Sequence, residues 1–291
     1  MDFPRALKHL ARLAYRDFPS DARLLVLAAH PDDETVGAAS LLLDLPRCVV
    51  VHLTDGAPFD KRLWPSGLLG DRRAYAHVRR AEALSALAEA KLLPESIMSF
   101  ACADQATSQH LVTLTRGFSQ LLERLDPQLI VTHAYEGGHP DHDAAAFIAA
   151  HALRLRHKQG RSLPALFEMT SYHSAPADPG ANITLPALET GRFLRRDECE
   201  VWTRTLDDEQ RARKRKMLAC YESQHAALTL FDSEQEHFRL APHYDFNVAP
   251  HPGTLHYEQR GWLHGSEWRK RAREAGERLG LASLEQQLPC V

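Results

Sequence analysis

Short apolar runs alternate with amphipathic stretches through roughly the first 175 residues of the chain. Four runs have the length and apolar character of buried strands, at 23–29, 48–56, 95–104 and 128–133. The stretches between and after them have the spacing or the turn-free composition of helices, at 36–45, 71–91, 109–125 and 143–157. Strands that alternate with helices at this spacing predict an α/β fold, a Rossmann-like parallel sheet with helices on both faces.

The alternation fades in the second half of the chain. A fifth strand is expected at 166–173, a charged helix at about 207–224 and an exposed helix at 265–287, whereas 226–265 shows no clear periodicity. Five histidines between 237 and 264 are irregularly spaced among prolines, which favours a surface loop over a metal site in this segment. We expect a Rossmann-like region at 1–175 and a less regular extension at 176–291, with helices and a segment that could form a cap, in one compact domain.

Side chains that bind metals gather at two predicted strand ends. The first run is followed by Ala29-His30-Pro31-Asp32-Asp33-Glu34, and the fourth by His139-Pro140-Asp141-His142. In the common strand order 3-2-1-4-5, strands 1 and 4 flank the crevice at the carboxyl edge of the sheet, so both segments should meet there. One His-Pro-Asp is more often a helix-capping turn, but two at matched positions predict a mixed His and carboxylate metal site of the catalytic zinc type.

Composition narrows the function classes. Thirty-five Lys and Arg against 38 Asp and Glu give a net charge of −3, which does not favour nucleic-acid binding. Apolar stretches such as 24–29 are far shorter than the ~18 to 20 residues of a membrane span. The first 20 residues interleave basic and apolar side chains as an amphipathic helix does. Five widely spaced cysteines form no C-x-x-C pair. We expect a cytoplasmic protein without a cysteine metal site.

Both motifs resemble the hallmark sequences of the LmbE and PIG-L family of metal-dependent N-deacetylases, and the resemblance extends over residues 23 to about 172. It implies that His30, Asp33 and His142 hold a zinc ion, that Asp32 is the general base, and that His139 stabilises charge. It further implies an amidohydrolase that cleaves the acetamide of an N-acetylated amino sugar, usually N-acetylglucosamine in a glycoconjugate. Such ligand sets also accept Fe²⁺ or another divalent metal.

Three further residues are substrate-binding candidates by the same resemblance. Arg79 matches the arginine of an R-x-x-E stretch that reaches the sugar, although an exposed ion pair explains it nearly as well. Asp104 matches an acid that contacts sugar hydroxyls, or it caps a helix. Several family members carry a carbonyl-polarising tyrosine where this chain has Gly137, and Tyr135 is a candidate to replace it.

Two other function classes stay open at this stage. One is a metal-dependent hydrolase of another amide or of a phosphoester, although a two-metal phosphoesterase needs more carboxylate ligands than these motifs supply if Asp32 stays free. The other is a non-catalytic Rossmann-like binding protein. A nucleotide-binding version is disfavoured, because neither G-x-G-x-x-G nor G-x-x-x-x-G-K follows a predicted strand.

Overall fold

A computed structural model describes residues 23–45, 47–68, 70–174, 187–194, 199–231 and 234–281. The helix expected in the first 20 residues lies outside this part of the chain, as do residues 282–287 of the expected C-terminal helix.

The centre of the molecule is a sheet of seven strands in the order β3-β2-β1-β4-β5-β9-β8. Its strands are β1 (Leu24–Ala28), β2 (Cys48–Pro58), β3 (Ile97–Asp104), β4 (Leu129–His133), β5 (Ala165–Met169), β8 (Val201–Thr205) and β9 (Gln235–Leu240). The first five pair in parallel, so the expected α/β class and the 3-2-1-4-5 order are confirmed. Strands β9 and β8 add to the β5 edge in antiparallel pairing.

Two expectations for the second half of the chain were wrong. The single strand expected at 166–173 is divided into β5 and β6 (Tyr172–Ser174), and β6 pairs with β7 (Leu188–Thr190) in a separate small sheet. The stretch expected to be a surface loop contains β9. Glu236 and Arg239 interrupt the apolar pattern of β9, and both are buried because charged side chains of other elements neutralise them.

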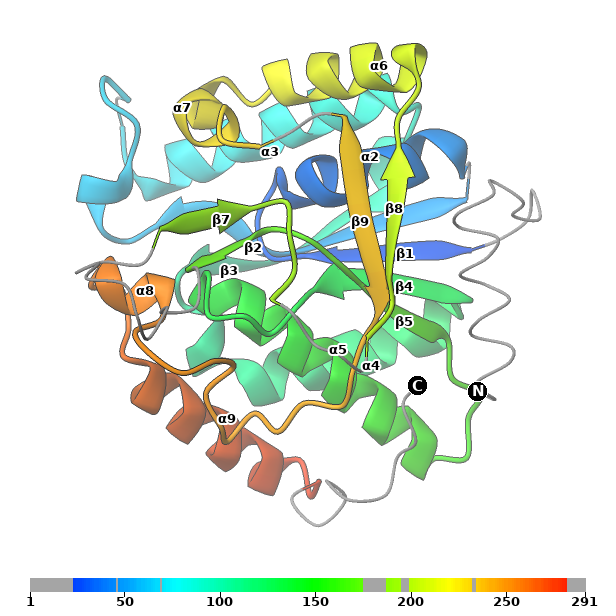
Figure 1. Cartoon of the computed structure of the whole chain (residues 1–291), viewed down its shortest axis with the longest axis vertical. Coiled ribbons are helices and arrows are strands. Elements are labelled where there is room, and N and C mark those ends of the chain that lie inside the picture. The colour runs from blue at the N-terminus through cyan, green and yellow to red at the C-terminus, as the bar shows by residue number, and fades with distance from the viewer. Residues whose placement is uncertain are drawn as a thin grey trace.

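Helices cover both faces of the sheet, as Figure 1 shows. One face carries α2 (Asp33–Asp44), α3 (Arg72–Glu89) and α6 (Asp208–Ala219), and the other carries α4 (Leu111–Leu125), α5 (Pro140–Lys158) and α9 (Gly265–Arg278). The short helices are α7 (His225–Leu228) and α8 (His256–Gln259), and the 3₁₀ turns are η1 (Lys61–Leu63), η2 (Pro94–Ser96), η3 (Thr107–Gln109) and η4 (Glu222–Gln224). Alternate residues of β1 enter two separate cores, Leu24 and Val26 on the α2 side and Leu25 and Leu27 on the α5 side.

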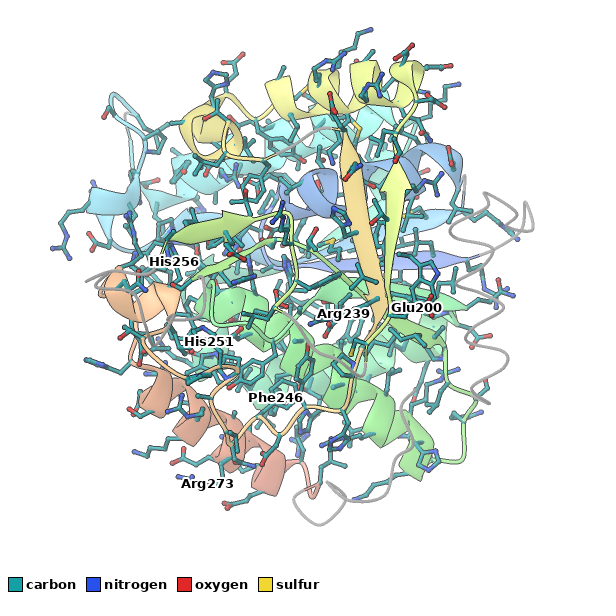
Figure 2. The ribbon with its side chains drawn as sticks, in the orientation of Figure 1. Glu200, Arg239, Phe246, His251, His256 and Arg273 are labelled. Carbon is teal, nitrogen blue, oxygen red and sulfur yellow. The ribbon has the colours of Figure 1, made fainter. Side chains whose placement is uncertain are left out.

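The extension after residue 175 is part of the same sheet as the region before it. Arg239 of β9, labelled in Figure 2, donates from Nε to Glu168 of β5 at 2.7 Å and from Nη2 to Glu136 at 3.1 Å. Glu136 belongs to the loop that joins β4 to α5, so this buried cluster connects β9 to the loop that carries the second motif. Within the described residues, none of the helices has both the length and the apolar character needed to cross a bilayer.

Candidate metal centre and active site

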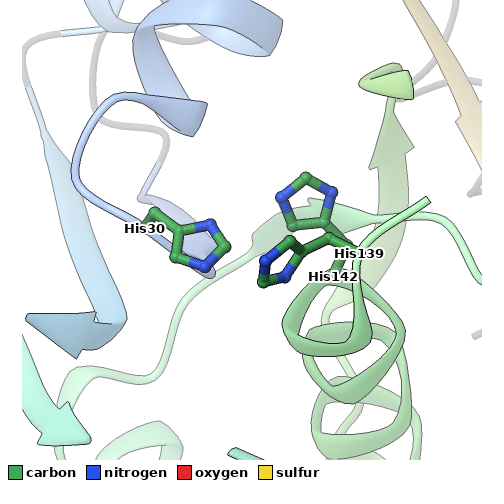
Figure 3. A group of neighbouring side chains, drawn as sticks. All are labelled: His30, His139 and His142. Carbon is green, nitrogen blue, oxygen red and sulfur yellow. The ribbon is translucent and has the colours of Figure 1, made fainter. Parts of the chain in front are cut away.

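The two sequence motifs meet at the carboxyl edge of the sheet. His30 lies in the loop between β1 and α2, whereas His139 caps α5 and His142 lies in its first turn. Strands β1 and β4 are neighbours, so the loops that follow them face each other. Figure 3 shows the three imidazole rings turned toward one another from these two sides.

A strained turn separates the two neighbouring acids of the first motif. Asp32 has φ 142° and ψ −30°, a conformation that L residues rarely adopt and that costs about 1 to 3 kcal/mol. Its N–H donates to the Glu34 carboxylate at 3.2 Å. Glu34 in turn accepts from the Tyr221 hydroxyl at 2.6 Å and lies 2.9 Å from His52 Nε2. These buried contacts hold the turn, and the side chains of Asp32 and Asp33 point to different partners.

Asp33 lies between the two histidines expected to bind metal. Its Oδ2 is 3.2 Å from His30 Nδ1 and its Oδ1 is 3.2 Å from His142 Nε2. Burial alone would raise the pKa of Asp33, but the neighbouring His142 and His133 hold that pKa well below its ordinary value. Burial, assisted by His133, lowers the pKa of His142 to about 4. The site therefore presents a carboxylate and a neutral imidazole.

The second ring nitrogen of each histidine has its own partner. His30 Nε2 lies 3.1 Å from Asp104 Oδ1 and 3.2 Å from Asp141 Oδ2, and His142 Nδ1 lies 3.3 Å from Ser171 Oγ. Burial lowers the pKa of His30, but these carboxylates outweigh it and raise that pKa well above its ordinary value. Metal-binding histidines are typically held through the other nitrogen in this way. His30, Asp33 and His142 thus offer the imidazole and carboxylate donors that a divalent metal takes, and His30 would have to lose its proton to bind one.

Three groups of side chains here could hold a metal ion, because the donor atoms within each group lie within 4.8 Å of one another. The first is His30, His139 and His142, and the second is His30, Asp104, His139 and Asp141. The third is Asp33, His133 and His142. Sequence reasoning assigned no role to His133 or Asp141. The position of His133 at the carboxyl end of β4 was the signal that could have found it. Asp141 accepts from the N–H groups of Gln105 at 2.6 Å and Thr107 at 3.2 Å, so its carboxylate also fastens η3 to the site.

His139 presents a hydrogen-bond donor to the cavity. Its Nδ1 accepts the N–H of Asp141 at 3.1 Å, and its Nε2 lies 3.8 Å from Asp104 Oδ1. Burial and the neighbouring His30 hold the pKa of His139 well below its ordinary value. The neutral ring therefore carries its proton on Nε2, because Nδ1 is an acceptor.

The Asp32 carboxylate faces Arg79, whereas the Asp33 carboxylate faces His30 and His142. Arg79 Nη2 donates to Asp32 Oδ2 at 2.9 Å and also to the Pro31 carbonyl oxygen. Burial raises the pKa of Asp32 to about 7, with Arg79 opposing the increase and Asp33 adding to it. The alternative of an exposed ion pair was wrong, because the Arg79 side chain is 2% exposed. Its contact with a sugar stays a prediction.

A cavity of about 410 Å³ opens above these groups. Its polar part contains the motif residues His30, Asp32, Asp33, His139 and His142 together with Arg79 and Asp104, and its remaining wall is largely apolar and aromatic. The extension supplies Phe231, Arg260 and Trp262, and the Trp262 ring lies 4.9 Å from the His139 ring. The expected capping segment thus lines the cavity.

The structure places Tyr135 away from this cavity. Its hydroxyl donates to the Val248 carbonyl at 2.9 Å, and its ring packs among Tyr244, Phe246 and Trp268. A tyrosine in place of Gly137 would be strained, since position 137 has φ 71° and a Cβ there would lie 2.7 Å from Leu255 Cδ2. Tyr75 and Tyr172 do line the cavity, and the ring centroid of Tyr172 lies 5.2 Å from that of His142.

The family model described as PIG-L, GlcNAc-PI de-N-acetylase, matches residues 25–153. These residues form a PIG-L family domain. Its match covers β1 to β4 and most of α5, including both motifs. No curated protein matches the chain.

Solved structures with the same fold include deacetylases named for teicoplanin and for the pseudoaglycone of the antimicrobial A40926. The A40926 pseudoaglycone deacetylase Dbv21 is 21% identical and has a TM-score of 0.54, over 75% of this chain and 96% of that one. The zinc-inhibited form of teicoplanin deacetylase Orf2 is 19% identical with a TM-score of 0.53, over 75% and 97%. A deacetylase–teicoplanin complex is 18% identical with a TM-score of 0.53, over 75% and 98%. At these identities the likeness concerns the fold of the PIG-L domain and its surroundings.

Proposed function

We propose that this protein is a metal-dependent N-deacetylase that hydrolyses the acetamide group of an N-acetylated amino sugar or of its conjugate. One observation carries the proposal: Asp33 lies 3.2 Å from both His30 Nδ1 and His142 Nε2, and a separate carboxylate, Asp32, lines the same cavity. We take His30, Asp33 and His142 as the proposed metal-binding set. The family description, which names a GlcNAc de-N-acetylase, supports this substrate class. So do the antibiotic deacetylases that share the fold.

The residues present fit one divalent ion held by two imidazoles and a carboxylate, a set that suits Zn²⁺ and also Fe²⁺. Such an ion supplies Lewis acidity, which polarises the amide carbonyl and lowers the pKa of water to about 7. Because His30 and His142 are held through their second nitrogens, their ligating nitrogens keep a fixed direction.

Asp32 is the proposed proton carrier. It lines the cavity and is oriented by Arg79, so it can accept a proton from the water that attacks the acetamide carbon. When the C–N bond breaks, the same carboxyl can deliver that proton to the departing amine, which leaves acetate and the free amino sugar. A single carboxylate thus serves both proton transfers.

His139 is the proposed donor to the developing oxyanion. Its Nε2–H enters the cavity because Nδ1 is fixed as an acceptor by Asp141 N–H. A fixed donor stabilises charge that appears only in the transition state. Asp104 and the Trp262 ring line the same cavity, where a sugar hydroxyl and a sugar face would find a hydrogen-bond acceptor and an apolar surface.

Release of acetate from N-acetylglucosamine and from an N-acetylglucosaminyl glycoside tests the proposal. We expect activity that a chelator abolishes and that Zn²⁺ restores, with one metal ion per chain by elemental analysis. An aryl phosphate serves as the matched control substrate and should not be cleaved. Phosphate release without acetate release, or two metal ions per chain, would contradict the deacetylase assignment in favour of a phosphoesterase.

A further inference from the structure

His133, the last residue of β4, touches the parts of the site that come from both motifs. Its side chain is 1% exposed. Its Nε2 accepts the N–H of Ala29, the residue before His30, at 3.1 Å and lies 3.3 Å from Asp33 Oδ2. Its ring is stacked on that of His142, with centroids 4.0 Å apart and planes 13° apart.

The contact with Ala29 stands where the backbone pairing of the sheet stops. The β1–β4 ladder ends at Val26 and Val131. Beyond this point two β4 side chains bond to the backbone of β1 and of the residue that follows it. The Thr132 hydroxyl donates to Leu27 O at 2.9 Å, and His133 Nε2 accepts from Ala29 N–H. The gap between the strand ends, across which His30 and His142 face each other, is therefore bridged by an imidazole.

We propose that His133 is a positioning residue of the metal centre, which fixes Asp33 and His142 relative to the His30 loop without binding the ion itself. This inference rests on the metal-binding set of the proposed function. The Nε2 lone pair is used by Ala29 N–H, and an imidazole nitrogen cannot accept a hydrogen bond and ligate a metal with the same lone pair. Its stacked face limits rotation of the His142 ring, and its bond from Ala29 N–H fixes the start of the loop that carries His30 and Asp33.

Two substitutions separate the ring from its nitrogen. His133→Phe keeps a flat ring against His142 and removes the acceptor for Ala29 N–H, whereas His133→Gln places an amide oxygen near the lost Nε2. His151→Phe is the matched control, since His151 is also buried, stacked on an aromatic ring at 3.8 Å and bonded to a backbone carbonyl. It lies in the middle of α5, outside the cavity.

The measurements are Zn²⁺ affinity by chelator competition and the thermal midpoint of the metal-free protein. We expect His133→Phe to weaken Zn²⁺ binding about 10- to 100-fold, the range for losing a residue that orients metal ligands. His133→Gln should recover part of that loss, and His151→Phe should bind Zn²⁺ as the unmodified protein does. A structural role alone would lower the thermal midpoint of both Phe variants and leave Zn²⁺ affinity unchanged.

Two results would overturn the assignment to His133. Unchanged Zn²⁺ affinity in His133→Phe would show that the bond from Ala29 N–H to Nε2 positions nothing. An altered Co²⁺ absorption spectrum in His133→Gln, with no recovery of affinity, would make His133 a ligand. Failure of the proposed function is distinguishable, because the unmodified protein would then bind no metal or release no acetate whichever residue stands at 133.

Discussion

Asp32 and Asp33 are chemically identical neighbours, and only the direction of the backbone between them separates their contacts. The positive φ of Asp32 turns its carboxylate toward Arg79, whereas Asp33 faces His30 and His142. Strain of this kind persists where surrounding contacts enforce it, and here the Glu34 carboxylate receives the Asp32 N–H.

Exchanging each acid for its amide should therefore give opposite results. Asp33→Asn should loosen or lose the metal, because an amide oxygen is a neutral and weaker donor. Asp32→Asn should keep full metal and lower kcat by about 10²- to 10⁴-fold, because the proton acceptor is gone. Metal content and kcat, measured on both variants, check this. The reverse outcome, with metal lost only in Asp32→Asn, would exchange the two roles.

His139 should contribute to the rate and not to metal retention. We expect His139→Ala to keep one metal ion per chain and to lower kcat about 10²- to 10³-fold, the range for removing one oxyanion donor. His77→Ala, on the exposed side of α3, is the control and should change neither quantity. Loss of metal in His139→Ala would place His139 among the ligands, as in the three-histidine group.

The loop from β4 to α5 carries His139 and is tightly packed against its neighbours. A Cβ on Gly138 would lie 1.8 Å from the Tyr172 carbonyl oxygen of β6. From within the loop, the N–H groups of Glu136 and Gly137 donate to Asp143 Oδ1 at 3.2 and 3.0 Å. The small sheet of β6 and β7 thus restricts the position of the loop that carries His139.

Gly138→Ala should displace this loop. Because the obstacle is backbone, we expect the free energy of unfolding to fall by about 1 to 3 kcal/mol, as for other overpacked sites, together with a loss of kcat from the shift of His139. Gly276→Ala in α9 is the control, since nothing lies within 4 Å of its Cβ position and alanine favours a helix. Chemical denaturation measures the free energy of unfolding of both variants, and kcat is measured beside it. If Gly138→Ala keeps the wild-type values of both quantities, the loop is free to move.

At the scale of the whole molecule, buried charges join the C-terminal extension to the α/β region. Lys214 of α6 donates to Glu236 of β9 at 2.8 Å and to the Val36 carbonyl of α2 at 2.7 Å. Glu236 also accepts from Ser40 N–H at 3.1 Å. Both charged side chains are almost fully buried, so neither can exchange its partner for water.

Removing one partner of this pair should destabilise the entire chain in one step. We expect Glu236→Gln to lower the free energy of unfolding by about 3 to 5 kcal/mol, because the Lys214 ammonium stays buried without its counter-ion. Asp60→Asn, which breaks the exposed pair with Arg62, should leave stability unchanged. Urea unfolding followed by two probes tests both. Separate transitions for the two halves of the chain would contradict a single cooperative unit.

The sequence by itself determined the parallel sheet, its strand order and the convergence of the two motifs. These follow from local pattern and connectivity: apolar runs of strand length alternate with helical stretches, and βα loops of neighbouring parallel strands meet at one edge. The proximity of His30, Asp33, His139 and His142 could be predicted because each belongs to a motif in the loop, or at the start of the helix, that follows a strand. The roles expected of them come from the family resemblance and stay predictions.

Tertiary structure decided what depends on contacts between distant segments. Strand β9 was missed because charged residues such as Glu236 and Arg239 are usually exposed. In the folded chain Lys214 pairs with Glu236. Arg239 pairs with Glu136 and Glu168. The candidate Tyr135 packs in the aromatic core instead of the cavity. Tyr172, from the end of the predicted fifth strand, and Trp262, from a segment without clear periodicity, line the cavity although neither was a candidate. Burial and charge pairing between elements set these positions, and neither is encoded in the spacing of residues along the chain.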